Sequence, residues 1–219
     1  MNHVKPPSIL ELEKGEITSA GDGIRLKLLG ITFEQIEPGP SPSYPAGSGA
    51  TARIEAADDF GRQATLPLSY LSDPYHGERI AFFQGYRIRW VDLGATSNNP
   101  SLKVEVKKLE EGDWQDLGST EWKLAEPVKL PGDLVVTFLA HGHKRTEVDG
   151  PPSPLLVQLR YEQSGRETVE ASERLETEEG RHTWFWREYR FVLADHAYGE
   201  WMRVRAYRAS EPVRHDPTP

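Results

Sequence analysis

The polypeptide alternates apolar and polar residues along short segments that end at Gly, Pro, Asn or Asp. A typical segment of this kind is Tyr86, Arg87, Ile88, Arg89 and Trp90. Because successive side chains of an extended chain point to opposite sides, a period of two predicts a strand with one apolar face. The 3.6-residue period of an amphipathic helix does not extend over about 11 residues anywhere in the chain. The pattern therefore predicts an all-β protein.

The same order of segments occurs twice along the chain. GERIAFFQGYRIRWVD (77–92) and GRHTWFWREYRFVLAD (180–195) are identical at five of sixteen positions without a gap. Further matches follow in the same order: GDGIRLKLLG with PGDLVVTFLA, ARIEAADDFGRQATL with VQLRYEQSGRETVEA, and LKVEV with MRVRA. The longest of these aligns Gly61 and Arg62 with Gly165 and Arg166. The spacing between the copies changes only at candidate loops, which predicts an internal duplication.

Each copy contains about six candidate strands, and a sheet with one apolar face is buried most simply in a two-layer sandwich or small barrel of antiparallel strands. We therefore predict two tandem, internally duplicated antiparallel β-sandwich domains, residues 9–108 and 119–209. Residues 109–118 contain a Glu-Gly-Asp turn between alternating arms and are expected to be a short hairpin-like connection. Residues 1–8 and 210–219 are expected to be tails.

Composition limits the compartment and the partners. The chain of 219 residues has a formal net charge of −8 and no cysteine. The acidic balance disfavours a nucleic-acid partner, because phosphate would be repelled. The lack of cysteine excludes disulfides, thiolate metal ligands and cysteine nucleophiles. The sequence has neither a membrane-length apolar run nor an apolar signal segment, so we expect a soluble cytoplasmic protein, with export of a processed form as the alternative.

Candidate chemistry is sparse. His141 and His143 share a face if their segment is extended, and together with His182 they are weak candidates for a zinc site. Ordinary surface histidines are the simpler interpretation, because the first copy has Ile31 and Phe33 at the corresponding positions. Paired carboxylates in candidate turns lack the ligand pattern of a calcium loop, and nucleophile motifs are absent. We therefore expect no cofactor, no metal and no catalytic residue.

Aromatic residues are the first candidates for binding. The second copy has more apolar residues than one sheet face needs, among them Trp184 and Trp186. These residues could pack against the first copy, form an exposed patch for a partner, or form a platform for sugars. Trp201 and Tyr44 are further candidates, and Tyr44 lies in the proline-rich loop IEPGPSPSYPAGSGA.

Basic residues of the first copy are the second set of candidates. The alternation lets five of them share one outer face, namely Arg25, Lys27, Arg87, Arg89 and Lys103. Such a face is either a solvated charged surface or a patch for an acidic partner. Among these residues, Arg25, Arg87 and Arg89 are the candidate binding residues.

The leading functional hypothesis is a non-catalytic binding protein. Its loops and the aromatic-rich surface of the second copy would contact another protein or a second copy of the chain. A carbohydrate-binding module is the alternative. An enzyme with a histidine and carboxylate site on a β-scaffold is the third hypothesis.

Overall fold

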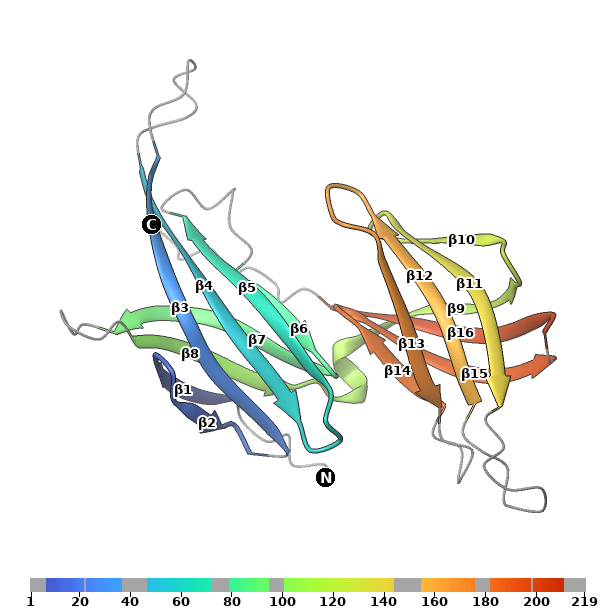
Figure 1. Ribbon diagram of the computed structural model, residues 1–219, viewed down its shortest axis with the longest axis horizontal. Coiled ribbons are helices and arrows are strands. Elements are labelled where there is room, and N and C mark those ends of the chain that lie inside the picture. Colours follow the sequence, from blue (N-terminus) through green and yellow to red (C-terminus); the bar gives the residue numbers. More distant parts are fainter. Residues whose placement is uncertain are drawn as a thin grey trace. The chain divides into compact units, whose positions relative to one another are not determined.

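The computed structural model describes residues 7–21, 23–36, 47–71, 79–94, 101–143, 155–175, 182–197 and 199–210. These residues form sixteen β-strands and one short 3-10 turn, so the all-β prediction is confirmed (Figure 1). They contain no helix that is long and apolar enough to cross a membrane. The chain divides between Glu110 and Glu111 into two compact units, named unit 1 and unit 2.

Each unit contributes eight strands. Those of unit 1 are β1 (Ser8–Glu13), β2 (Ile17–Ser19), β3 (Ile24–Ile36), β4 (Gly47–Asp58), β5 (Gln63–Leu71), β6 (Ile80–Phe83), β7 (Tyr86–Gly94) and β8 (Ser101–Lys108). Unit 2 begins with the 3-10 turn η1 (Glu111–Asp113). Its strands are β9 (Trp114–Lys123), β10 (Pro127–Leu130), β11 (Leu134–His143), β12 (Leu155–Gln163), β13 (Val169–Leu175), β14 (Thr183–Trp186), β15 (Tyr189–Ala197) and β16 (Trp201–Ala209).

Unit 1 consists of two antiparallel four-stranded sheets, β1-β8-β7-β6 and β2-β3-β4-β5. Apolar residues of both sheets form one buried cluster, in which Leu26, Ile54 and Ile88 are inaccessible to solvent. Unit 1 is therefore a β-sandwich with its core between the sheets. The chain passes from one sheet to the other at Gly15, which has a positive φ of 86° and donates its N–H to the carbonyl of Leu28 at 2.9 Å.

Unit 2 has the same strand order, β9-β16-β15-β14 and β10-β11-β12-β13, and a buried cluster of its own. Its first strand also changes sheets, at Ala125, whose N–H donates to the carbonyl of Phe138 at 2.8 Å. Bulges fall at corresponding places, after Leu28 and Phe138 and after Trp90 and Leu193. The two units thus share one sandwich topology. Their descent from a duplication remains a prediction.

One detail of the internal sequence alignment is wrong. The N–H of Gly61 closes the β4–β5 turn by donating to the carbonyl of Asp58 at 3.2 Å. In the β12–β13 turn, the N–H that donates to the carbonyl of Gln163, at 3.0 Å, belongs to Arg166. Gly61 therefore corresponds to Arg166 and not to Gly165, and the strand ladders agree. The shared Gly-Arg sequence is out of register by one residue because the positive φ lies at Gly61 in the first turn and one position earlier, at Gly165, in the second.

Residues 109–118 do not form the expected hairpin-like connection. Strand β8 pairs with β1 and β7, whereas β9 pairs with β16, so the two strands lie in sheets of different units. The turn between them is the single 3-10 turn Glu111–Asp113. The alternating segments before and after this turn bury their apolar residues in two separate cores, since Val106 is buried in unit 1 and Trp122 in unit 2.

The aromatic surplus of the second copy fills its own core. Trp184 is 1% exposed and Trp186 is 9% exposed. Trp186 stacks on Tyr161 with ring centroids 4.8 Å apart, and the corresponding positions of unit 1 include the small residue Ala56. Trp184 and Trp186 are therefore core residues of unit 2. The predictions that they form an exposed patch or pack against the first copy are wrong. Aromatic side chains there replace the smaller apolar side chains of unit 1.

Candidate functional site

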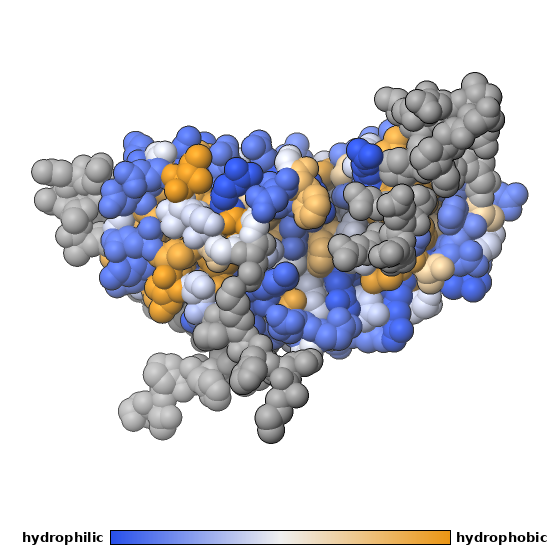
Figure 2. Space-filling model, turned by 90° about the horizontal axis from the view of Figure 1, so that it is seen from below, coloured by the Kyte–Doolittle hydropathy of each residue, from blue (hydrophilic) through white to orange (hydrophobic). Residues whose placement is uncertain are grey.

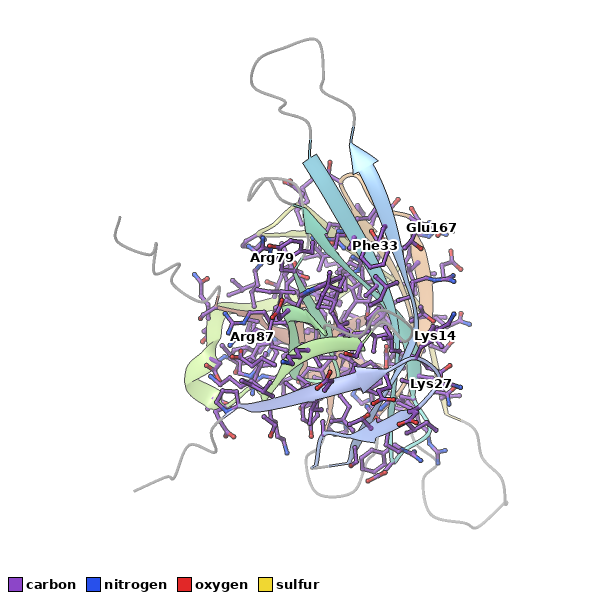
Figure 3. All side chains as sticks on the ribbon, turned by 90° about the vertical axis from the view of Figure 1, so that its left-hand side faces the viewer. Lys14, Lys27, Phe33, Arg79, Arg87 and Glu167 are labelled. Carbon is purple, nitrogen blue, oxygen red and sulfur yellow. The ribbon has the colours of Figure 1, made fainter. Side chains whose placement is uncertain are left out.

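The basic patch predicted for the first copy is not one patch. Arg87 and Arg89 lie on the outer face of β7, and both donate to Glu105 of β8, at 3.4 and 2.7 Å. Arg25 lies on β3, which belongs to the other sheet. Lys27 is on the same face of β3 as Arg25, and Figure 3 shows Lys27 and Arg87 on opposite sides of unit 1. The prediction failed because the two sheets of a sandwich turn their outer faces in opposite directions.

One candidate histidine, His141, takes part in a hydrogen bond and a ring contact. The Nε2 atom of His141 accepts the N–H of Gly199 at 2.5 Å, and its ring meets that of His196 edge-on at 5.6 Å. The side chain of His143 lies outside the described residues, and His182 precedes β14. In the described part of the chain, no three His, Asp or Glu side chains gather closely enough to hold a metal ion.

Of the aromatic candidates, Trp201 is the one that reaches the surface of the described structure. Tyr44 lies outside the described residues, and Trp184 and Trp186 are in the core. Trp201 is half-buried on β16, and the guanidinium carbon of Arg203 lies 5.6 Å from its ring centroid. This contact begins a continuous set of arginine and aromatic side chains on the outer face of unit 2.

A row of four side chains crosses that face from edge to edge. Phe185 of β14 pairs with Arg190 of β15, Arg190 pairs with Tyr207 of β16, and Tyr207 pairs with Asp116 of β9. Directly paired residues of neighbouring strands point to the same side of a sheet. The alternate residues, such as Phe191, are buried in the core, so this row points outward. It forms because the four strands have matching inside-outside alternation.

Arg190 is the centre of this row. Its guanidinium carbon lies 4.2 Å from the ring centroid of Tyr207 and 5.2 Å from that of Trp114. Its two terminal nitrogens donate to the two carboxylate oxygens of Glu111, at 2.7 and 2.8 Å. These bonds hold the pKa of the Glu111 carboxyl below its ordinary value, and they raise the pKa of Arg190. The guanidinium is thus fixed between two rings and one carboxylate.

Arg205 is the second arginine beside the ring of Tyr207. Its guanidinium carbon is 5.5 Å from the centroid of the Tyr207 ring, and it forms an ion pair with Asp116. The hydrogen bond from Arg205 lowers the pKa of the Asp116 carboxyl, and the N–H of Gly118 adds to this effect. Asp116 accepts that N–H at 2.8 Å beside the bulge that interrupts the β9–β16 ladder.

We name this surface the arginine–aromatic face. Its residues are Trp114, Phe185, Arg190, Trp201, Arg203, Arg205 and Tyr207. Among them, Trp201 alone is a candidate binding residue predicted from the sequence. The segment WMRVRAYR carries the signal that was missed, because its period of two places one tryptophan, two arginines and one tyrosine on one side of a strand.

Unit 1 has a different surface at the same place in its topology. The corresponding row is Phe82, Arg87 and Lys107, and Glu105 occupies the position of Arg205. Elsewhere, strongly exposed apolar side chains belong to separate strands and turns, for example Phe60, which is 81% exposed. In the view of Figure 2, apolar side chains form small separate patches among hydrophilic ones. The arginine–aromatic face joins arginine and aromatic side chains from four neighbouring strands, and it is the candidate functional site.

Guanidinium groups lie beside two aromatic rings of this face, those of Tyr207 and Trp201. Both guanidinium groups beside Tyr207 lie within cation–π distance of its ring, and Trp114 is 8% exposed. Neither protein-family models nor curated protein sequences give a match to this chain.

Proposed function

We propose that this protein is a non-catalytic binding protein that contacts another protein through the arginine–aromatic face of unit 2. The observation that carries the proposal is the outward row of Phe185, Arg190 and Tyr207 on three neighbouring strands. Tyr, Trp and Arg supply most of the binding energy in protein interfaces, because each combines a large contact area with a directional polar group. The same topology in unit 1 carries a predominantly charged row instead.

Preorganisation supports this proposal. The ring of Tyr207 and the carboxylate of Glu111 hold Arg190 on a four-stranded sheet, so its guanidinium loses little rotamer freedom when a partner binds. Trp114 and Phe185 pack beneath it with ring centroids 6.0 Å apart. A rigid sheet also positions recognition residues more accurately than a loop does.

A sugar platform receives less support from the same side chains. Stacking on a sugar needs an exposed aromatic ring face, whereas Trp184 and Trp186 are in the core and Tyr207 lies between two guanidinium groups. Trp201 also has the guanidinium of Arg203 beside its ring. We therefore retain protein recognition as the single proposed function.

Comparison of two arginines tests the proposal. Arg190 and Arg87 occupy corresponding strand positions, and their side chains are 15% and 13% exposed. The full chain and its variants Arg190→Ala, Tyr207→Ala and Arg87→Ala are immobilised and incubated with extract of the source cells. Mass spectrometry then identifies the retained proteins, and sedimentation of the chain alone distinguishes a foreign partner from a second copy.

The expected result is a partner that binds the unaltered chain and Arg87→Ala but is lost from Arg190→Ala and Tyr207→Ala. Circular dichroism checks that each variant retains its strands. Retention of the same proteins by all four chains would refute the proposal, as would an equal loss from the Arg87→Ala variant.

A further inference from the structure

The two units differ in the carboxylate that pairs with the central arginine of the outer face, which is Arg87 in unit 1 and Arg190 in unit 2. In unit 1 Arg87 is paired with Glu105, a residue of the neighbouring strand whose side chain is 12% exposed. In unit 2 the position of Glu105 holds Arg205, and the carboxylate on Arg190 comes from Glu111, whose side chain is 77% exposed. Unit 2 thus has a guanidinium at the position where unit 1 has its carboxylate, and Arg190 receives its carboxylate from an exposed turn.

The second guanidinium, that of Arg205, is also paired with an exposed carboxylate. Arg205 is paired with Asp116 of the edge strand β9, whose side chain is 42% exposed. Exposed ion pairs are weak, because water and salt screen them and two side chains must be held in place. Both carboxylates can therefore give way to a stronger ligand, while Arg190 keeps its contacts with Tyr207 and Trp114.

We propose that the arginine–aromatic face binds an acidic peptide segment of its partner, two carboxylates of which replace Glu111 and Asp116 on Arg190 and Arg205. This inference rests on the proposed function and names the chemistry of the partner. The chain's own carboxylates mark where the ligand groups would lie, since Glu111 engages both terminal nitrogens of Arg190. A planar guanidinium presents a fork of donors that matches a carboxylate.

Glu111 then acts as an internal competitor for Arg190. Its turn, η1, precedes β9 and is tied to the end of β16 by the N–H of Ser210, which donates to the carbonyl of Asp113 at 2.8 Å. Removal of the Glu111 charge would leave Arg190 in place between its rings and free its donors for an external carboxylate. Affinity for an acidic ligand should therefore rise when Glu111 is neutralised and fall when Arg205 is.

Fluorescence anisotropy tests this with a fluorescein-labelled peptide of alternating Glu and Ser residues and a matched peptide of Gln and Ser. The full chain is compared with Glu111→Gln, Arg205→Gln and Glu121→Gln. Glu121 is a matched control, because it lies on the same face with its carboxylate 3.8 Å from Arg203, and its loss changes the net charge equally. We expect the Glu peptide to bind and the Gln peptide not to bind. Relative to the unaltered chain, the affinity for the Glu peptide should be about two- to fivefold higher in Glu111→Gln and correspondingly lower in Arg205→Gln.

Equal binding of the Gln peptide, or the same gain in Glu121→Gln as in Glu111→Gln, would overturn the inference. So would the absence of saturable binding of the Glu peptide to Glu111→Gln. These failures differ from a failure of the proposed function. A cellular partner could fail to bind Tyr207→Ala and yet bind Glu111→Gln and Arg205→Gln as it binds the unaltered chain. That result would support the arginine–aromatic face as the binding surface and would refute the inference that it recognises an acidic segment.

Discussion

Trp184 donates its indole N–H to the hydroxyl oxygen of Tyr161 at 3.0 Å within the core of unit 2. Both side chains are almost completely buried, so the bond satisfies two polar groups that have no access to water. The corresponding positions of unit 1 hold Ala81 and Ala56, which need no such bond. One sandwich topology therefore accommodates either small side chains or a hydrogen-bonded aromatic pair, provided that both sheets change together.

The first prediction concerns this bond. Tyr161→Phe should lower the free energy of unfolding by about 1–3 kcal/mol, because it leaves the buried indole N–H of Trp184 without its acceptor. Urea denaturation of Tyr161→Phe, Trp184→Phe and the double variant measures the coupling between the two side chains. Additive losses in this cycle would mean that the bond does not stabilise the core.

The second prediction concerns alkaline pH. Burial raises the pKa of Tyr161 well above its ordinary value of 10.0 and raises that of Tyr189 to about 12. Both hydroxyls remain protonated in the folded chain at pH values where they ionise in the unfolded chain. Their contribution to stability is complete below pH 10 and is lost as pH rises through the folded pKa values. Tyr189 alone should contribute a loss of about 1–2 kcal/mol between pH 10 and pH 12, and Tyr161 should add to this loss.

Urea denaturation across this pH range measures the loss, and the Tyr161→Phe variant provides the comparison. The variant should lose less stability than the unaltered chain over the same interval. Parallel curves for the two proteins would contradict the assignment of the effect to Tyr161.

The third prediction concerns the close approach of Gly132 to Tyr189. A Cβ atom on Gly132 would lie 2.5 Å from the oxygen of the Tyr189 hydroxyl, and the O–H of this group donates to the carbonyl of Pro131. Gly132 also has a positive φ of 82°. Gly61 has a similar φ of 80° but no atom within 4 Å of such a Cβ. Gly61→Ala should therefore cost about 1 kcal/mol for the backbone conformation alone.

Gly132→Ala should cost more than Gly61→Ala, by about 1–2 kcal/mol, because it must also displace the Tyr189 hydroxyl from its hydrogen bond. Midpoints and slopes of urea denaturation compare the two variants directly. Equal costs would mean that Tyr189 moves aside without loss.

The fourth prediction concerns acid pH. The bonds from Arg190 lower the pKa of Glu111 below its ordinary value of 4.5, so ionised Glu111 stabilises the folded chain. This contribution is present above pH 4.5 and is lost as pH falls through the lowered folded pKa. We expect Glu111→Gln to be slightly less stable than the unaltered chain at neutral pH, by less than about 1 kcal/mol, since the pair is exposed.

The difference between the two proteins should vanish at acid pH, where Glu111 itself is protonated. Denaturation in urea at neutral and acid pH, with Glu121→Gln as the control, measures it. A difference that persists unchanged at acid pH would indicate that the glutamate acts through packing and not through its charge.

The alternation of side chains predicted that the chain forms strands and which side of many of them is buried, but it gave about six strands to each copy where each unit has eight. Tyr86, Ile88 and Trp90, which alternate with arginines in the sequence, are all buried in unit 1. Strand formation and the side to which each residue points follow from a local period of two, which is legible in a single segment. The matched order of segments also agrees with the common strand order of the two units.

What the sequence by itself determined is therefore the all-β class and the buried side of those strands that alternate clearly. The tertiary structure decided which strands share a sheet, and this separated Arg25 from Arg87 and joined Arg190 to Glu111, 79 residues away along the chain. It also decided that Trp184 packs against Tyr161 inside unit 2. Pairing between strands depends on contacts between distant segments, whereas the period of two is the same whichever neighbour a strand acquires.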